Sequence, residues 1–282
     1  MTHTISNNFI TVKINTLGAE VQSLKNQNRE YIWNGNPIYW AKHAPVLFPI
    51  VGTLKDNCYF YDNKKYFLSR HGFARNCQFE LIHQKKDTLI FSLLFNEVTL
   101  NVFPFKFELQ IKYTLQNKSL CVCFDVINKD IKSIPFSIGA HPAFALQQNI
   151  KNYSLLFEDQ EILESFELKN DLISNFSNKI VLRNKTLPLN YDLFKNDALI
   201  FKKIVSKKIT ILENDVALLD ICYKSFKNFG IWTTFDAPFI CLEPWLGYSD
   251  ATAHDQKILH KEGIQIVKEN CTFTCSYAIN IS

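Results

Sequence analysis

The sequence contains no motif for a structural metal or a bound nucleotide. None of its 8 cysteines belongs to a CxxC pair, and no spacing of cysteine and histidine suits zinc. No glycine-rich loop that would cradle phosphates is present. These absences argue against a zinc domain or a nucleotide-binding enzyme. We expect most cysteines to act as small apolar residues in a reducing compartment.

Signals for membranes and nucleic acids are also missing. No segment approaches about 18 uninterrupted apolar residues, and the first residues show no basic stretch followed by an apolar one. The 31 Lys+Arg and 27 Asp+Glu give a net charge of +4, and the basic residues are scattered in short pairs. We therefore expect a cytoplasmic protein with no membrane and no nucleic-acid partner.

Helical periodicity is weak, and alternation of apolar and polar residues dominates the sequence. Residues 107–115 and 273–281 alternate throughout, which is typical of half-buried antiparallel strands. Shorter alternating runs cover residues 9–14, 59–68, 79–83, 89–95, 120–127, 209–212 and 216–223. The final run predicts that the chain ends in a strand paired within a sheet.

These patterns predict an all-β fold. No βαβ rhythm, linker, low-complexity tract or internal repeat is visible, so we expect one domain over residues 1–282, built as a large antiparallel β-sandwich. The best helical pattern, at residues 250–260, predicts a single short helix. Residues 34–56 form the longest stretch without alternation, and a loop of that length is often functional.

One candidate site is the run of small and apolar residues that ends at His141. Gly139 and Ala140 leave space beside the histidine, and Pro142 favours an extended backbone before it. An imidazole in this setting exchanges protons near neutral pH. A buried histidine that bonds a backbone carbonyl is the alternative interpretation.

Two further stretches place polar groups in apolar surroundings. Arg70 and Arg75 flank His71, and Gly72 permits close approach of the backbone, which suits a ligand rich in oxygen; an exposed basic hairpin is the alternative. Glu243 interrupts an apolar run, and burial would raise its pKa and make it a usable general base. A structural glutamate paired with arginine is the alternative there. Trp245 adds a flat apolar face suited to a sugar.

Together these stretches resemble the aldose 1-epimerase, or galactose mutarotase-like, family. The motifs that carry the resemblance span most of the chain: Ala44-Pro-Val-Leu-Phe-Pro-Ile-Val-Gly52, His71-Gly-Phe-Ala-Arg75, Gly139-Ala-His-Pro142 and Cys241-Leu-Glu-Pro-Trp-Leu-Gly247. The nearest branch resembles short bacterial proteins related to aldose 1-epimerase. The resemblance implies a β-sandwich with an open sugar-binding cleft.

The resemblance also implies roles for individual residues. Glu243 matches the general base at the C1 hydroxyl of the sugar, and His141 matches the acid at the ring oxygen. His71 and Arg75 match sugar-binding residues, and Asp197 matches, more weakly, an aspartate that holds hydroxyls. The implied enzyme is an isomerase of small-molecule sugars without metal or cofactor, as a monomer or weak homodimer. We expect a sugar ring end to separate His141 from Glu243 by about 5 to 8 Å, a span that includes two hydrogen bonds.

One departure from the family bears on the substrate. The hexose-6-phosphate branch carries an Arg-Gly-Gly run where this chain has Ala41-Lys-His43, and Lys42 supplies a point charge without bidentate geometry. This favours a free aldohexose, with hexose-6-phosphate 1-epimerase as the alternative. A carbohydrate-binding protein without turnover is a further alternative. A glycoside hydrolase ranks last because it needs two carboxylates at the bond it cleaves.

Overall fold

The computed structural model describes residues 1–282 and consists mainly of antiparallel strands. A nine-stranded sheet follows the order β17 (Thr186–Pro188), β14 (Tyr153–Phe157), β19 (Lys208–Glu213), β20 (Val216–Cys222), β24 (Thr272–Ile281), β10 (Ser119–Asn128), β9 (Phe107–Gln116), β8 (Thr88–Leu94) and β7 (Glu80–Gln84). The last strand, β24, lies between β20 and β10, so the prediction that the chain ends within a sheet is confirmed.

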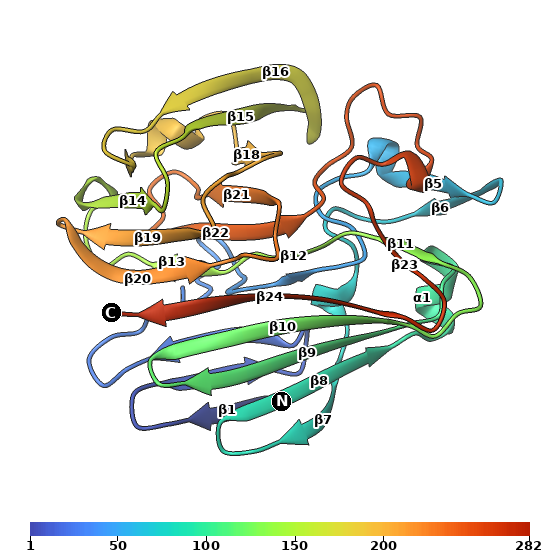
Figure 1. The fold of residues 1–282 in the computed structure, drawn as a ribbon, viewed down its shortest axis with the longest axis horizontal. Coiled ribbons are helices and arrows are strands. Elements are labelled where there is room, and N and C mark those ends of the chain that lie inside the picture. Colours follow the sequence, from blue (N-terminus) through green and yellow to red (C-terminus); the bar gives the residue numbers. More distant parts are fainter.

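A second large sheet has eight strands. Its order is β16 (Leu172–Val181), β15 (Ile162–Lys169), β18 (Leu199–Phe201), β21 (Asn228–Trp232), β22 (Phe239–Leu246), β12 (Ile138–Ala140) and β4 (Val46–Leu47), and β13 (Ala143–Ala145) also pairs with β22. Figure 1 shows β15, β18, β21 and β22 above the strands β24, β10, β9 and β8 of the nine-stranded sheet. The all-β, stacked-sheet prediction is confirmed.

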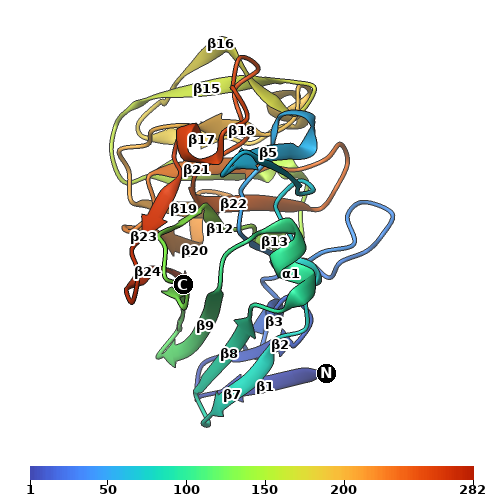
Figure 2. The same ribbon diagram turned by 90° about the vertical axis from the view of Figure 1, so that its right-hand side faces the viewer.

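Smaller elements complete the structure. Three strands, β1 (Thr2–Ser6), β2 (Thr11–Asn15) and β3 (Glu20–Lys25), form a sheet that Figure 2 shows beside β7 and β8. Two further sheets have two strands each: β5 (Cys58–Tyr61) pairs with β6 (Lys64–Phe67), and β11 (Ile134–Phe136) pairs with β23 (Gln265–Val267). The only α-helix is α1 (Glu97–Val102), and 3-10 turns occupy Lys55–Asn57, Ala74–Asn76, Ile150–Asn152, Tyr191–Phe194 and Ile258–His260.

The core lies between the sheets and follows the alternation of the sequence. In β9 the residues Phe107, Leu109 and Ile111 are fully buried, whereas Glu108 and Gln110 between them are half-buried. A cluster of 68 buried residues contains the apolar face of this strand and the matching faces of its neighbours. Period-two patterning therefore decided which face of each strand enters the core.

The helix predicted at residues 250–260 is absent, and this prediction was wrong. The backbone of Asp250 donates to Thr53 and accepts from Ile173, so it bonds other segments in place of its own helix. The observed helix α1 has six residues and is fixed by a capping box between Asn96 and Thr99. A helix this short has too few turns to produce a readable periodicity.

No helix in the structure has the length and hydropathy needed to cross a lipid bilayer. All eight cysteines are free, and three of them, Cys58, Cys241 and Cys275, are buried. The expectation that most cysteines are core residues therefore holds for these three, while Cys271 is exposed and the rest are half-buried.

Candidate functional site

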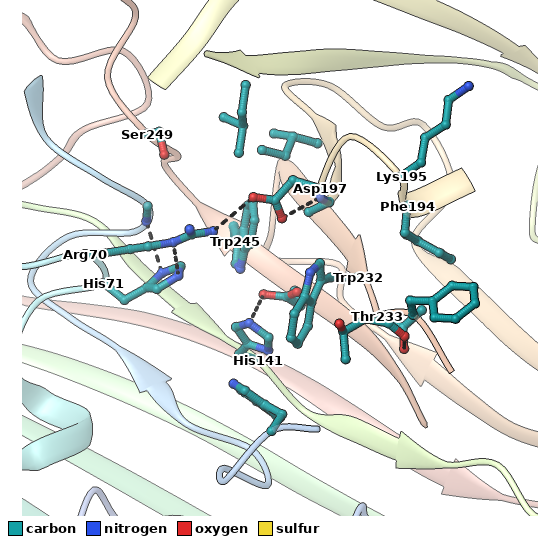
Figure 3. Close-up of a pocket in the computed structure, with 18 of the residues that line it drawn as sticks. Arg70, His71, His141, Phe194, Lys195, Asp197, Trp232, Thr233, Trp245 and Ser249 are labelled. Atoms are coloured by element: carbon teal, nitrogen blue, oxygen red, sulfur yellow. Dashed lines mark hydrogen bonds and ion pairs between the residues drawn. The ribbon is translucent and has the colours of Figure 1, made fainter. Parts of the chain in front are cut away.

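A pocket of about 690 Å³ lies on the eight-stranded sheet. Strand β22 supplies Glu243 and Trp245, and the connection between β12 and β13 supplies His141. The loop after β6 supplies Arg70 and His71, as Figure 3 shows. Three motifs that are far apart in the sequence thus line one cavity of the size typical for small-molecule sites.

The alternation of β22 places its carboxylate in this pocket. Ile240 and Leu242 point into the main core between the sheets. Glu243 directly follows Leu242 in the strand. Its side chain therefore lies on the opposite face, where it lines the pocket. Because all residues of β22 are buried, this carboxyl is removed from bulk water.

Sheet register brings His141 to Glu243. Gly139 pairs with Trp245 and Ala143 pairs with Cys241, so His141, midway between them, stands opposite Glu243. The Nε2 atom of His141 lies 3.1 Å from Oε2 of Glu243. The expected separation of 5 to 8 Å was therefore too long, because facing cross-strand side chains contact each other directly.

Burial shifts the pKa values of the two groups in opposite directions. Glu243 is 1% exposed, and loss of water raises its pKa well above 4.5, while the Arg70 charge opposes this shift. Loss of water also lowers the pKa of His141 to about 3. Both shifts favour uncharged groups, a neutral imidazole beside a protonated carboxyl.

Aromatic rings fix the orientation of His141. Trp40 stacks on its imidazole with a centroid distance of 4.8 Å and an interplanar angle of 27°. Trp232 meets the same ring edge-on at 5.8 Å. Sequence reasoning did not assign either tryptophan to the site, although Trp40 lies in the long loop at residues 34–56 that was expected to be functional.

His71 sits on a strained turn against the backbone of Gly52. Its φ is 67°, its amide donates to the Gly52 carbonyl at 2.8 Å, and its Nδ1 accepts from the Gly52 amide at 3.1 Å. Burial and the neighbouring His141 lower its pKa well below 6.5, so the ring is neutral. A neutral imidazole accepts at one nitrogen only. Donors face both ring nitrogens, because the Gly52 amide lies at Nδ1 and Nε of Arg70 lies 3.2 Å from Nε2.

Arg70 crosses the mouth of the pocket between two aspartates. Its Nη1 lies 3.1 Å from Asp171, its Nη2 lies 3.9 Å from Asp197, and its Nε lies 3.2 Å from Nε2 of His71. Figure 3 shows Arg70 between His71 and Asp197. The sequence motif placed both arginines beside a ligand rich in oxygen, whereas the family resemblance implied a binding role for Arg75 alone.

Arg75 lines the pocket but also supports Arg70. Its Nη2 donates to the Arg70 carbonyl at 2.7 Å, and the guanidinium is about half-buried beneath the rim. Lys42, the expected substitute for a phosphate-binding arginine, is not among the residues that line the pocket, whereas Lys195 is. The lysine that was expected to replace the arginine of the hexose-6-phosphate branch therefore lies outside the cavity.

Trp245 is held edge-on between two glycines. A Cβ at Gly139 would come within 2.6 Å of its indole, and a Cβ at Gly230 would do the same from the other side. Gly139 therefore makes room for Trp245, and this indole occupies the space that we expected Gly139 to leave beside His141. Trp245 is 4% exposed and offers the pocket only part of its ring.

One set of metal-type donors overlaps the acid–base pair. Donor atoms of His141, Cys241 and Glu243 all lie within 4.8 Å of one another. Burial raises the pKa of the Cys241 thiol well above 9.0 and so disfavours the thiolate that binds metals. A metal ion there would occupy the same atoms that form the His141–Glu243 contact.

Known proteins resemble this chain along its whole length. The family model described as "Aldose 1-epimerase" matches residues 1–213. Protein LacX from Lactococcus lactis subsp. lactis is 33% identical, with 100% of this chain and 99% of that protein covered. A galactose mutarotase related enzyme from Lactobacillus acidophilus is 34% identical with a TM-score of 0.94, over 100% of this chain and 97% of the other. A galactose mutarotase-like protein from Lactobacillus casei is 29% identical with a TM-score of 0.92, and both chains are fully covered.

The matched family and the fold agree with the motifs found in the sequence. Three of those motifs converge on one pocket, and the model match covers the His71 and His141 motifs, with Glu243 beyond its end. This chain belongs to the aldose 1-epimerase family.

Proposed function

We propose that this chain interconverts the α and β anomers of a free aldohexose. The observation that carries the proposal is the buried contact of 3.1 Å between His141 and Glu243 in a pocket open to a ligand. Opening a hemiacetal ring removes a proton from the C1 hydroxyl and adds one to the ring oxygen. A base that accepts the C1 hydroxyl proton and an acid that protonates the ring oxygen supply both proton transfers.

The proton count of the pair fits a reversible reaction. Glu243 as carboxylate takes the C1 hydroxyl proton, and His141 as imidazolium protonates the ring oxygen as the C1–O5 bond breaks. The products are an open aldehyde, a carboxylic acid and a neutral imidazole. After rotation about C1–C2, Glu243 returns its proton to the C1 oxygen, His141 takes its proton back from the O5 hydroxyl, and the ring closes as the other anomer. The uncharged resting pair reaches its reactive ionised form by moving one proton across the 3.1 Å contact.

The rest of the pocket supports sugar binding. Its volume of about 690 Å³ accommodates about 20 groups of the size of water at about 30 Å³ each, and an aldohexose has about 12 non-hydrogen atoms. His71 offers a polar ring edge, Asp197 offers carboxylate oxygens, and Arg70 offers a planar fork of donors. Hydroxyl groups of a sugar match this mixture of donors and acceptors.

A phosphorylated sugar is the second candidate. Arg70 and Lys195 line the pocket, and both could contact a phosphate. Arg70, however, already lies between Asp171 and Asp197, and these carboxylates repel an anion. Lys42 contributes nothing to the cavity. The charge balance therefore favours the free sugar.

An NMR exchange or polarimetric screen tests the proposal. Purified protein is mixed with freshly dissolved α-glucose, α-galactose, their 6-phosphates and a matched glycoside. We expect faster anomer exchange of a free aldose, with no strong gain from the phosphate. A gain in kcat/KM of about a hundredfold or more on phosphorylation would reverse the substrate choice. Sugar binding without faster exchange would identify a binding protein, and release of the aglycone would identify a hydrolase.

A further inference from the structure

A buried ion pair lies next to the pocket and takes no part in the proton transfers. The Nζ atom of Lys261 lies 2.8 Å from Oδ1 of Asp250, and their side chains are 1% and 0% exposed. Lys261 also donates to the Tyr248 carbonyl, and Oδ2 of Asp250 accepts from the Lys55 amide at 2.9 Å. His254 faces the same carboxylate at 3.3 Å. A charge pair this deep needs hydrogen-bond partners to be tolerated, and both side chains have partners beyond each other.

The pair is connected to His71 by a chain of short hydrogen bonds. The Asp250 amide donates to the Thr53 carbonyl at 2.8 Å, and the Thr53 amide donates to Oγ of Ser249 at 2.9 Å. The next residue back, Gly52, exchanges two hydrogen bonds with His71. Gly52 has a φ of +74°, and a Cβ there would lie 2.3 Å from Oγ of Ser249. The segments around Gly52 and Ser249 are therefore packed too closely to admit a side chain at Gly52.

A second connection reaches the rim of the pocket. The Asp250 carbonyl accepts from the amide of Ile173, at the start of β16. Asp171, two residues earlier, forms the ion pair with Arg70. One buried carboxylate residue thus contacts the segments that hold both the imidazole and the guanidinium on this side of the pocket.

We propose that the Asp250–Lys261 ion pair positions the His71 and Arg70 side of the sugar site by locking residues 248–250 against residues 52–55. The inference rests on the sugar-binding role proposed above. Asp250 and Lys261 do not line the pocket, so they act through Gly52 and His71 as positioning residues. A pair that served stability alone would leave the geometry of His71 unchanged when an uncharged pair replaced it.

The test is the double variant Asp250→Asn/Lys261→Met, which removes both charges and keeps similar shapes. Replacing a buried ion pair as a unit is often tolerated, whereas either single change leaves an unpaired charge. We expect a folded protein with KM for the sugar raised about tenfold, the size of one lost hydrogen bond. We expect kcat within about threefold, because His71 contacts the sugar in ground and transition states alike.

A second readout does not depend on turnover. The amide resonance of Gly52 and the Nδ1 resonance of His71 should both shift in the double variant, because their hydrogen bond lengthens. If the wild type does not accelerate mutarotation, the proposed function is rejected. The Gly52 and His71 resonances can still be measured and still test the positioning role. If the double variant fails to fold, Lys261→Gln, which keeps an amide donor, is measured by the same two readouts.

The matched control is the half-buried pair Arg29–Glu213, which does not line the pocket. Arg29→Met/Glu213→Gln should alter stability and leave KM and the Gly52 resonance unchanged. A folded Asp250→Asn/Lys261→Met protein with wild-type KM and wild-type Gly52 and His71 resonances would overturn the positioning role. The same result for Lys261→Gln would overturn it as well.

Discussion

The floor and the rim of the pocket use similar charged residues in different surroundings. On the floor, Glu243 and His141 have side chains that are 1% and 11% exposed, and burial shifts both pKa values strongly. On the rim, the side chains of Arg70 and Asp171 are 42% and 53% exposed. Water stabilises their charges, so we expect the rim to contribute binding and the floor to contribute proton transfer. Burial, more than residue type, separates the two tasks.

The largest expected effect comes from removing the base on the floor. Glu243→Gln keeps the shape of the side chain and removes its ability to accept a proton. We expect mutarotation to fall by about 100- to 10,000-fold, with sugar affinity within about tenfold. Polarimetry gives the rate and calorimetry gives the affinity. Glu262→Gln is the control, because this glutamate is 58% exposed and lies outside the pocket; equal rates for wild type and Glu243→Gln would end the assigned role.

A second effect concerns stability in acid. The pKa of His141 is 6.5 in the unfolded chain and about 3 in the folded protein because of burial, so between these values the unfolded chain binds more protons. This contribution to the free energy of unfolding is present above pH 6.5 and is lost as the pH falls toward 3. The raised pKa of Glu243 acts in the opposite direction, since its contribution is present below pH 4.5 and is lost at higher pH.

Comparison with His141→Gln isolates the histidine. Between pH 6.5 and pH 4 the wild type should lose about 3 kcal/mol more than the variant, measured by urea unfolding across the pH range. His260→Asn, at a side chain that is 59% exposed, is the control. Parallel curves of unfolding free energy against pH for wild type and His141→Gln would show that the imidazole is not desolvated as described. The floor and the rim would then not differ in this respect.

The smallest effects are expected at the rim. Arg70→Met should raise KM about tenfold and leave kcat within about threefold, because the fork of donors holds hydroxyls in ground and transition states alike. Asp171→Asn should raise KM by less than about threefold, since an exposed ion pair contributes little. Steady-state kinetics on the substrate found in the screen measures both. A loss of kcat at Arg70→Met as large as that at Glu243→Gln would place chemistry at the rim.

Strands were the most predictable part of the fold. The alternating run at residues 273–281 lies in β24, and the run at 107–115 lies in β9. These strands were predictable because exposed and buried residues alternate along a half-buried strand. Short elements were less predictable. The six residues of α1 are too few to show a helical periodicity. The segment at 250–260 forms no helix, because the backbone of Asp250 forms hydrogen bonds with Thr53 and Ile173.

The site was predictable where a motif carried it. His71, His141, Glu243, Trp245, Arg75 and Asp197 all line the pocket, whereas Lys42 does not. Arg70 was part of a candidate motif without an assigned role, and Trp40 was missed as a site residue, since nothing local distinguishes a tryptophan that stacks on a distant histidine from one in the core. Their catalytic and binding roles stay predictions for the experiments above.

The sequence by itself determined which face of the alternating strands, such as β9 and β24, enters the core. Tertiary structure alone decided that His141 stands opposite Glu243 at 3.1 Å. That contact depends on the register of β12 and β13 against β22, which long-range hydrogen bonds set. Local alternation has a period of two and fixes the face of a side chain, but it contains no information about which residue of a distant strand lies across from it.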